Sequence, residues 1–350
     1  MTDFIIGNTW IATLKERRVL PVFGDIVLKN GMISEIRKHD FQDFLRTDIS
    51  RLEDKNIVDV GGRITTVPFI NFHDHFYSRL ARGLIASGEM ENFRQILQNL
   101  WWKLDRLLDN KLIQAAVDQG CMESLRSGVT YVFDHHASPG SITGVLPLMA
   151  KRLQDRGLRS VLCMEVSDRV GEEKAHQQLE ENAEFIKTQE GPDVRGMLGL
   201  HAPFTLSDMT LEIASGLRGS LGCAIHIHLA EDAYEQEFSH ERFGRSPVER
   251  LEKYHLLTPE SLLVHGVHLT REDYTLIAER GSAIVLNPDS NMNNSVGLPQ
   301  YGGIPQNIML LPGTDGMHGG IGRTFKQLYL LARHQGFSFE RATGWIEKIY

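Results

Sequence analysis

The stretch Val67-Pro68-Phe69-Ile70-Asn71-Phe72-His73-Asp74-His75 joins an apolar run directly to two histidines and an acid. The apolar part predicts a buried strand, within a candidate strand over residues 64–72. Residues i and i+2 of a strand point to the same face, so both imidazoles are expected on one face and Asp74 on the other. Two histidines buried side by side favour a metal site over a pair of core histidines, because unpaired polar groups are costly to bury.

Other apolar runs also end in histidines or acids. His226 and His228 repeat the spacing of the first pair, and Glu231 follows just past the end of their strand. His265 ends another run, and Asp315 follows a further run and is flanked by glycines, which permit a close approach of the backbone. Imidazole and carboxylate ligands that converge from separate strand ends form an open metal site able to activate water. The candidates for such a site are His73, His75, His201, His226, His228, Glu231, His265 and Asp315.

Strand patterns alternate with helical patterns from residue 64 onward, which predicts an α/β fold. This alternation suits a TIM-like (β/α)8 barrel over residues 64–350, whose strand ends share one mouth. A doubly wound sheet is the alternative, but no Gly-x-Gly-x-x-Gly follows the first strand. The candidate strands are 64–72, 129–134, 158–165, 195–201, 222–229, 261–265, 282–287 and 307–312. The helical patterns include 90–108, 111–126, 142–155, 172–188, 208–218, 246–254 and 271–279.

Residues 1–63 are expected to form a separate, small β subdomain. Short β-branched runs are punctuated by glycine, and Asn30-Gly31 between two of them is a strong hairpin signal. We therefore predict an antiparallel unit that precedes the barrel.

The composition is that of an ordinary globular protein, with 350 residues, 41% hydrophobic and 23% charged. The formal net charge of −8 argues against nucleic-acid polymers and anionic membranes as partners. Three widely spaced cysteines form no CxxC pair, which fits a reducing cytoplasm. The first residues lack a signal-peptide pattern, and no run approaches the ~18–20 apolar residues that span a bilayer. We expect a cytoplasmic protein whose partners are a small-molecule substrate and, as an option, a second copy in a homodimer.

Several longer stretches resemble the amidohydrolase superfamily, and within it the chlorohydrolase and deaminase branch. Other hydrolytic patterns are missing, among them HExxH and a GxSxG elbow. The resemblance covers nearly the whole chain, and its motifs are specific in combination. The stretches that carry it are residues 70–75, 99–106, 133–140, 165–169, 199–208, 287–292 and 313–316.

The resemblance implies a TIM-like barrel with one divalent metal ion, for which zinc is preferred and iron(II) is the alternative. A single ion is favoured because the fourth strand ends in His201 rather than in a lysine. The family's metal ligands correspond to His73, His75, His228 and Asp315. The resemblance assigns catalytic roles to Glu231 as the proton shuttle, to His265 and to Asp315, and a substrate contact to His201. His136 and Arg169 are further candidates for the pocket, although Arg169 could instead pair with Asp168.

The chain departs from the family pattern in three places. Val67-Pro68 stands where Pro-Gly is usual, and Asp74 is acidic where a small polar residue is usual. The chain ends at Tyr350, whereas the resemblance implies further strands that complete a β-sandwich with the N-terminal segment. Without those strands, residues 4–36 are expected to present unpaired edges.

The expected reaction is hydrolytic deamination of a small, purine-like or pyrimidine-like heterocycle by a metal-activated water. Asp315 would take a proton from the water, His265 would hold the nucleophile, and Glu231 would protonate the ring nitrogen and then assist the departure of ammonia. Hydrolysis of an exocyclic amide or a carbon–halogen bond at the same site is the nearest alternative. A metal-binding partner protein without catalysis is the alternative from another class. Trp101-Trp102 is expected to fill core volume rather than stack on substrate.

Overall fold

The computed structural model describes residues 3–15, 18–42, 56–189 and 191–349. The chain separates into two compact units, Met1–Pro68 and Phe69–Tyr350, and each is described by itself. The described cysteines are free thiols, as their spacing predicted.

The first unit is a five-stranded sheet. Strands β1 (Phe4–Lys15), β2 (Arg18–Lys29) and β3 (Met32–Lys38) form an antiparallel meander, as predicted. Asn30 and Gly31 have φ angles of 52° and 76°, which is the conformation that a two-residue hairpin turn of type I′ requires. Strands β4 (Ile57–Asp59) and β5 (Ile64–Thr65) pair with β1 in parallel, which the antiparallel prediction did not include.

The rings of Trp10, Phe23 and Phe41 form a small aromatic core in this unit. Their centroids lie 4.9–5.3 Å apart. Strand β3 lies at one end of the strand order, and all seven of its residues are exposed.

The prediction of one strand over residues 64–72 was wrong. Residues 64 and 65 belong to β5 in the first unit, whereas Phe69 begins β6 (Phe69–Asp74) in the second. Pro68 lies between them, and because proline has no backbone N–H it cannot continue a hydrogen-bonded ladder.

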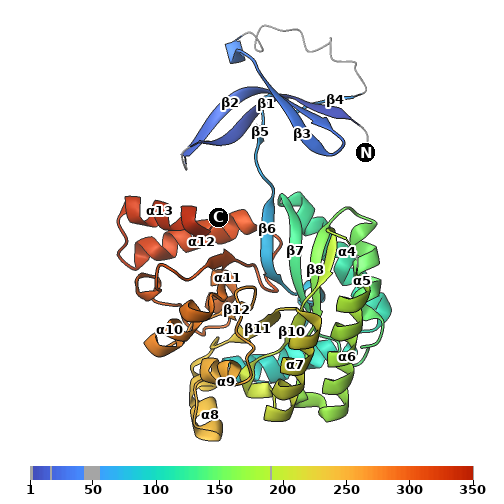
Figure 1. The fold of residues 1–350 in the computed structure, drawn as a ribbon, viewed down its shortest axis with the longest axis vertical. Helices are drawn as coiled ribbons and strands as arrows, with labels where there is room; N and C mark the ends of the chain where they lie inside the picture. Colours follow the sequence, from blue (N-terminus) through green and yellow to red (C-terminus); the bar gives the residue numbers. More distant parts are fainter. Residues whose placement is uncertain (1–2, 16–17, 43–55, 190, 350) are drawn as a thin grey trace. The chain divides into compact units, whose positions relative to one another are not determined.

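The second unit contains two parallel sheets. One has the order β6-β7-β8-β9 and the other the order β10-β11-β12-β13-β14 (Figure 1). Single parallel bridges link the two, from Val166 to Leu200 and from Asp74 to Asp315. Each of the other seven predicted strands has a counterpart within a few residues. The bounds are β7 (Val129–His136), β8 (Arg159–Met164), β9 (Val194–Gly196), β10 (Leu198–Leu200), β11 (Ile225–Leu229), β12 (Leu262–His265), β13 (Ala283–Leu286) and β14 (Leu310–Pro312).

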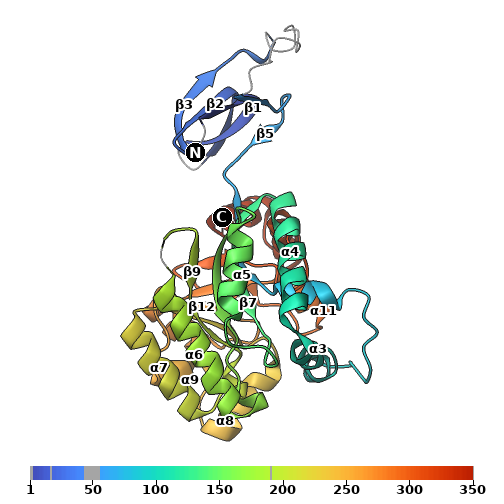
Figure 2. The same cartoon turned by 90° about the vertical axis from the view of Figure 1, so that its right-hand side faces the viewer.

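Helices follow most strands and lie around the sheets (Figure 2). The predicted helix over 90–108 is divided into α2 (Phe93–Ile96), a π-helical turn η3 (Leu97–Trp101) and α3 (Trp102–Leu107). Four helices have no counterpart among the helical patterns given above, namely α8 (Ala233–Phe243) and the last three, α11 (Pro288–Asn293), α12 (Ile321–His334) and α13 (Phe339–Ile349). The remaining helices are α4 (Asn110–Arg126), α5 (Val145–Gln154), α6 (Glu172–Thr188), α7 (Asp208–Leu221), α9 (Pro247–Lys253) and α10 (Arg271–Arg280), with short 3-10 turns at Phe76–Ala81 (η2), Asp168–Val170 (η4), Pro203–Thr205 (η5) and Tyr301–Gly303 (η6).

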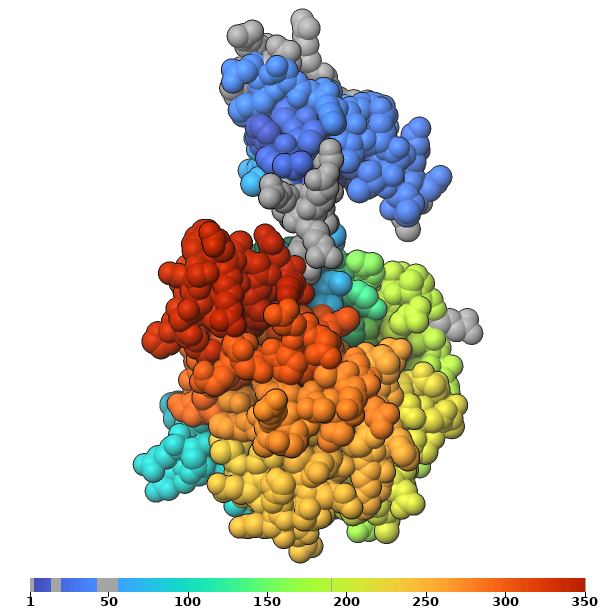
Figure 3. Space-filling view, turned by 60° about the vertical axis from the view of Figure 1, so that its left-hand side comes forward, coloured from blue at the N-terminus to red at the C-terminus, as the bar shows by residue number. Residues whose placement is uncertain are grey.

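Two hydrophobic clusters show that the strands are buried on both faces. Leu262 and Val264 pack with Val161 and Val285 on one face of the strands. Leu263, which alternates with them, joins a larger cluster that includes residues of the outer helices. Burial on both faces explains why these strands read as unbroken apolar runs. Figure 3 shows α12 and α13 packed together on the surface of this unit.

Candidate active site

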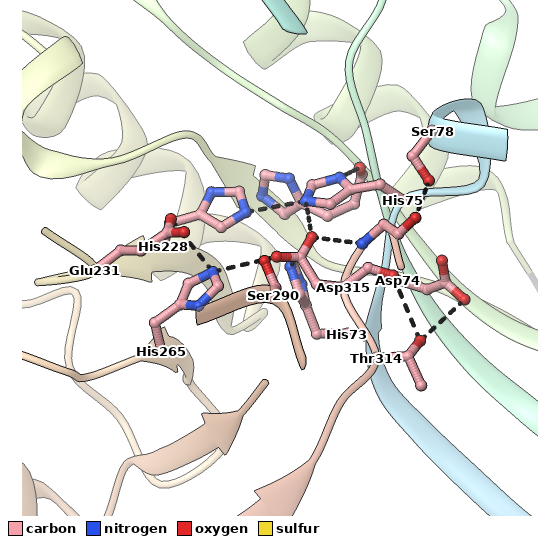
Figure 4. Close-up of polar contacts among 12 residues, drawn as sticks. His73, Asp74, His75, Ser78, His228, Glu231, His265, Ser290, Thr314 and Asp315 are labelled. Carbon is pink, nitrogen blue, oxygen red and sulfur yellow. Dashed lines mark hydrogen bonds and ion pairs between the residues drawn. The ribbon is translucent and has the colours of Figure 1, made fainter. Parts of the chain in front are cut away.

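Five of the predicted residues converge where the parallel strands end. His73 lies in β6, His75 directly after it, His228 in β11 and His265 at the last position of β12, while Asp315 follows β14. Their side chains point toward one another (Figure 4). All four histidines are at least 93% buried, because their relative exposures are 7% or less. The polar residues that the sequence pattern places at strand ends therefore lie together in the structure.

The distances within this cluster suit a single ion. The Nε2 atoms of His75 and His228 lie 3.1 Å apart. Asp315 Oδ1 lies 3.4 Å from His75 Nε2 and 3.7 Å from His73 Nε2. His73, His75 and His228 form one group, and His73, His265 and Asp315 another, in which the ligand atoms all lie within 4.8 Å of one another.

The hydrogen bonds of the imidazoles leave their Nε2 atoms without protons. A carbonyl oxygen can only accept, so His75 Nδ1 carries a proton that it donates to the His135 carbonyl at 2.5 Å. His228 Nδ1 donates in the same way to the His201 carbonyl at 2.8 Å. Two Nε2 lone pairs thus face each other at 3.1 Å inside the protein, an arrangement that repels unless a cation lies between them.

A relay of side-chain hydrogen bonds also leaves the Nε2 atom of His73 without a proton. Cys163 Sγ donates to the Asp134 carbonyl at 3.7 Å and can therefore accept from His226 Nδ1 at 3.8 Å. His226 Nε2 is then left to accept from His73 Nδ1 at 2.9 Å. His73 Nε2 is buried and makes no hydrogen bond to any described residue.

The electrostatics keep these ligands in the forms that bind a cation. Burial lowers the pKa of His73 from 6.5 to about 3, and burial also lowers the pKa values of His75 and His228. Burial by itself would raise the pKa of Asp315, but the close approach of His73 and the neighbouring imidazoles of His75 and His265 hold that pKa well below the usual range. Neutral imidazoles and an ionised carboxylate are a donor set that binds divalent ions such as zinc and iron(II).

Glu231 has the opposite electrostatic environment. Burial and the nearby Asp315 carboxylate raise its pKa well above 4.5. Its Oε2 lies 3.4 Å from His265 Nε2, and its Oε1 accepts from Asn294 Nδ2 at 3.2 Å. A raised pKa favours the protonated form of a carboxyl group, which is the form that serves as a general acid.

Three residues at these strand ends adopt a left-handed backbone conformation that is unusual for residues other than glycine. Ala230, His265 and Asp315 have φ angles of 48°, 77° and 53°. Such conformations cost about 1–3 kcal/mol each and cluster at functional sites, where the surrounding structure enforces them. The last two, His265 and Asp315, are members of the cluster itself.

A cavity opens beside the cluster, but only one of the three predicted substrate contacts lines it. His201 lies on its surface. His136 is buried behind it and bonds Ser138 Oγ through Nε2 at 3.0 Å. Arg169 does not line this cavity and pairs not with Asp168 but with Asp105 at 2.5 Å and Glu165 at 3.2 Å.

The structure adds lining residues to which sequence reasoning assigned no role. Trp101 and Trp102 pack against a hydrophobic cluster, as expected, and they also line the cavity. Tyr77, Asp105 and Glu165 line it as well. Glu165 was detectable in principle, since it lies at the end of a predicted strand. Asp105 could not be identified from the sequence, because nothing in a helical stretch shows which acidic residue faces a cavity.

The chain belongs to the amidohydrolase family, whose model matches residues 66–345. A 5-methylthioadenosine/S-adenosylhomocysteine deaminase of Thermococcus sibiricus is 30% identical over 277 residues, which are 78% of this chain and 61% of that protein. A 5'-deoxyadenosine deaminase of Methanococcus aeolicus is 28% identical over 297 residues, 83% of this chain and 66% of that protein. The chain thus spans about three-fifths to two-thirds of the length of these curated relatives.

Solved structures share the fold. A zinc-bound adenosine deaminase from Xanthomonas campestris has a TM-score of 0.76 at 20% identity, covering 97% of this chain and 75% of that chain. A guanine deaminase from C. acetobutylicum with bound guanine has a TM-score of 0.78 at 15% identity, covering 99% of this chain and 87% of that chain. None of the described helices is long and apolar enough to cross a membrane.

Proposed function

We propose that this chain carries the active site of a metal-dependent aminohydrolase that deaminates a small, purine-like heterocycle. The observation that carries the proposal is the convergence of three unprotonated Nε2 atoms and one ionised carboxylate beside a carboxyl group whose pKa is raised. The relatives named as deaminases of adenosine-type nucleosides support the substrate class.

The metal ligands are His73, His75, His228 and Asp315, and the ion is zinc. The orphaned Nε2 of His73 and the opposed Nε2 atoms of His75 and His228 support this assignment. When bound, a divalent ion supplies Lewis acidity that lowers the pKa of water from about 15.7 to about 7.

Three residues of the chain handle the protons. Asp315 accepts a proton from the attacking water, while His265, fixed by a 2.8 Å bond from Nδ1 to Asn291 Oδ1, orients that water through Nε2. Glu231 gives its proton to the ring nitrogen as the carbon–oxygen bond forms. The proton that Asp315 took then goes to the amino group, which leaves as ammonia when the carbon–nitrogen bond breaks. The proton left on the new hydroxyl passes to Glu231 as the carbonyl forms, which restores the protonated acid. His201 contacts the heterocycle from the facing side of the cavity.

The scaffold of this site is an eight-stranded barrel that begins at Phe69 rather than at the predicted residue 64, and the preceding residues form a separate N-terminal β subdomain. Counting β9 and β10 as one interrupted strand gives eight positions in the second unit. The bridges from Val166 to Leu200 and from Asp74 to Asp315 join the two sheets at both sides and support closure.

Ammonia release by the full chain tests the reaction. We expect turnover of at least one adenosine-type nucleoside by zinc-loaded protein, and Glu231→Gln should keep its metal yet lose about 10²–10⁴-fold in kcat. Glu237→Gln on the exposed side of α8 is the matched control and should leave the rate unchanged. An unchanged rate in Glu231→Gln, or no ammonia from any purine or pyrimidine tested, would refute the proposal.

A further inference from the structure

One side of the cavity presents hydrogen-bond acceptors. We call His201, Glu165 and Asp105 the acceptor wall; all three line the cavity. His201 Nδ1 bonds Thr205 Oγ1 at 2.7 Å, and that hydroxyl donates its proton to the Ala202 carbonyl at 3.0 Å. His201 must therefore carry its proton on Nδ1, which leaves the lone pair of Nε2 as the acceptor.

The other two members of the wall are carboxylates that share one arginine. Arg169 Nη2 bonds Asp105 Oδ2 at 2.5 Å and Glu165 Oε1 at 3.2 Å. Asp105 is 1% exposed, and its Oδ1 has no hydrogen-bond partner among the described residues. Two carboxylates and one guanidinium leave this group with a net negative charge when both acids are ionised.

No positive side chain offsets that charge at the cavity surface. Among the described residues that line the cavity, none is lysine or arginine. Arg169 is held behind the wall, with its guanidinium carbon 5.3 Å from the centre of the Trp102 ring. Trp101 and Trp102 present aromatic surface to the cavity, which attracts cations as well as apolar groups.

We propose that the acceptor wall selects the substrate by charge and by hydrogen-bond donors: the site takes heterocycles that carry hydroxyl, N–H or ammonium groups and excludes those that carry phosphate or carboxylate. An anion placed against the acceptor wall would lose its water and meet acceptors and negative charge there, which is unfavourable in a partly buried site. An ammonium or hydroxyl group instead satisfies Asp105 Oδ1. The inference rests on the proposed function for the identity of the ring.

Three adenosine analogues that differ only at the 5' position test the charge preference: the 5'-amine, the 5'-hydroxyl and the 5'-monophosphate. We expect kcat/KM on zinc-loaded protein to be highest for the amine and at least about a hundredfold lower for the phosphate than for the hydroxyl. Equilibrium binding of the same three compounds is measured in parallel. Equal kcat/KM across the series overturns the inference and leaves the proposed function intact. Binding graded by charge with no ammonia released supports the wall and refutes deamination, whereas no binding of any compound refutes both.

Asp105→Asn tests whether the wall causes the preference. The substitution keeps the shape but removes one negative charge, so the ratio of kcat/KM for amine to phosphate should fall about tenfold or more. Glu180→Gln, an exposed position on α6, removes the same charge elsewhere and should leave the ratio unchanged. Metal content and the thermal midpoint identify a variant that fails to fold. In that case the substrate series on the unmodified protein still decides whether the site has the proposed charge preference. An unchanged ratio in folded, metal-loaded Asp105→Asn overturns the role of the wall.

Discussion

The imidazole of His226 determines which nitrogen of His73 is free to bind a cation. Its Nε2 accepts the His73 Nδ1 proton only while its own Nδ1 donates to Cys163 Sγ. Hydrogen-bond partners of metal-ligating histidines fix their tautomer, and losing one typically costs 10–100-fold in metal affinity. His226 is thus a positioning residue that acts through His73.

We expect His226→Ala to weaken zinc binding by about 10–100-fold. Without an acceptor, the His73 ring can rotate or move its proton to Nε2, which then no longer offers a lone pair. Competition with a chelator of known affinity measures the change. His268→Ala is the control, because His268 bonds the Val296 carbonyl at 2.7 Å outside this relay and should not alter zinc affinity. Equal zinc affinities in His226→Ala and the unmodified protein would contradict the relay.

The set of candidate site residues was predictable from sequence because a polar residue at the end of a buried parallel strand is expected at one edge of the sheet, while the choice of four ligands among them rests on the family resemblance. The tautomers of the histidines could not be predicted from sequence, and neither could the left-handed backbone of Ala230, His265 and Asp315. They arise from contacts between residues far apart in the chain, such as His73 with His226. The positions of Arg169 and His136 behind the cavity follow from partners that no local pattern shows.

At the scale of elements, strands were predicted better than helices between them. Parallel strands buried on both faces leave unbroken apolar runs, whereas α8 buries mainly polar residues such as Glu235 and Ser239. That helix is instead stabilised at its N-terminus, where Asp232 and Glu235 form a capping box. The Glu235 carboxylate also accepts from the backbone N–H groups of Ala230 at 3.1 Å and Glu231 at 2.8 Å. This single side chain therefore shapes the turn that presents Glu231.

Glu235 should make stability depend on pH. Burial and the neighbouring Glu231 raise its pKa from 4.5 to about 7, so the folded state holds this proton more tightly than the unfolded state. The stabilisation from protonated Glu235 is fully present below pH ~4.5 and is lost as pH rises through about 7, a change on the order of 3 kcal/mol. Glu235→Gln does not titrate. Between pH 4.5 and 8, the unfolding free energy of the unmodified protein should fall relative to that of Glu235→Gln.

Chemical denaturation at several pH values across that range measures the difference. Glu241→Gln, an exposed position near the end of α8, serves as the control and should follow the unmodified protein throughout. Parallel pH profiles for Glu235→Gln and the unmodified protein would show that the Glu235 proton is not retained on folding.

At the scale of the whole molecule, the candidate metal centre joins the first and last strands of the second unit. His73 lies in β6, and Asp315 follows β14, with the backbone N–H of Asp315 donating to the His73 carbonyl at 3.0 Å. A bound ion would add a link between these two strands and β11, whose His228 is the third contributor. The first unit supplies none of the proposed ligands.

Removing the metal should therefore destabilise the second unit selectively. Zinc at 100 times its dissociation constant adds about 2.7 kcal/mol to the unit that binds it, which corresponds to a thermal midpoint about 5–10 °C higher. Hydrogen exchange, measured with zinc and with excess chelator, locates the effect. Peptides from β6, β11 and the segment after β14 should exchange faster without zinc, while peptides from β1, β2 and β3 should not change. Unchanged exchange at all three strand ends, with zinc content confirmed on the same sample, would mean that the ion binds elsewhere, because a ligand that binds only the folded site must stabilise the elements that form it.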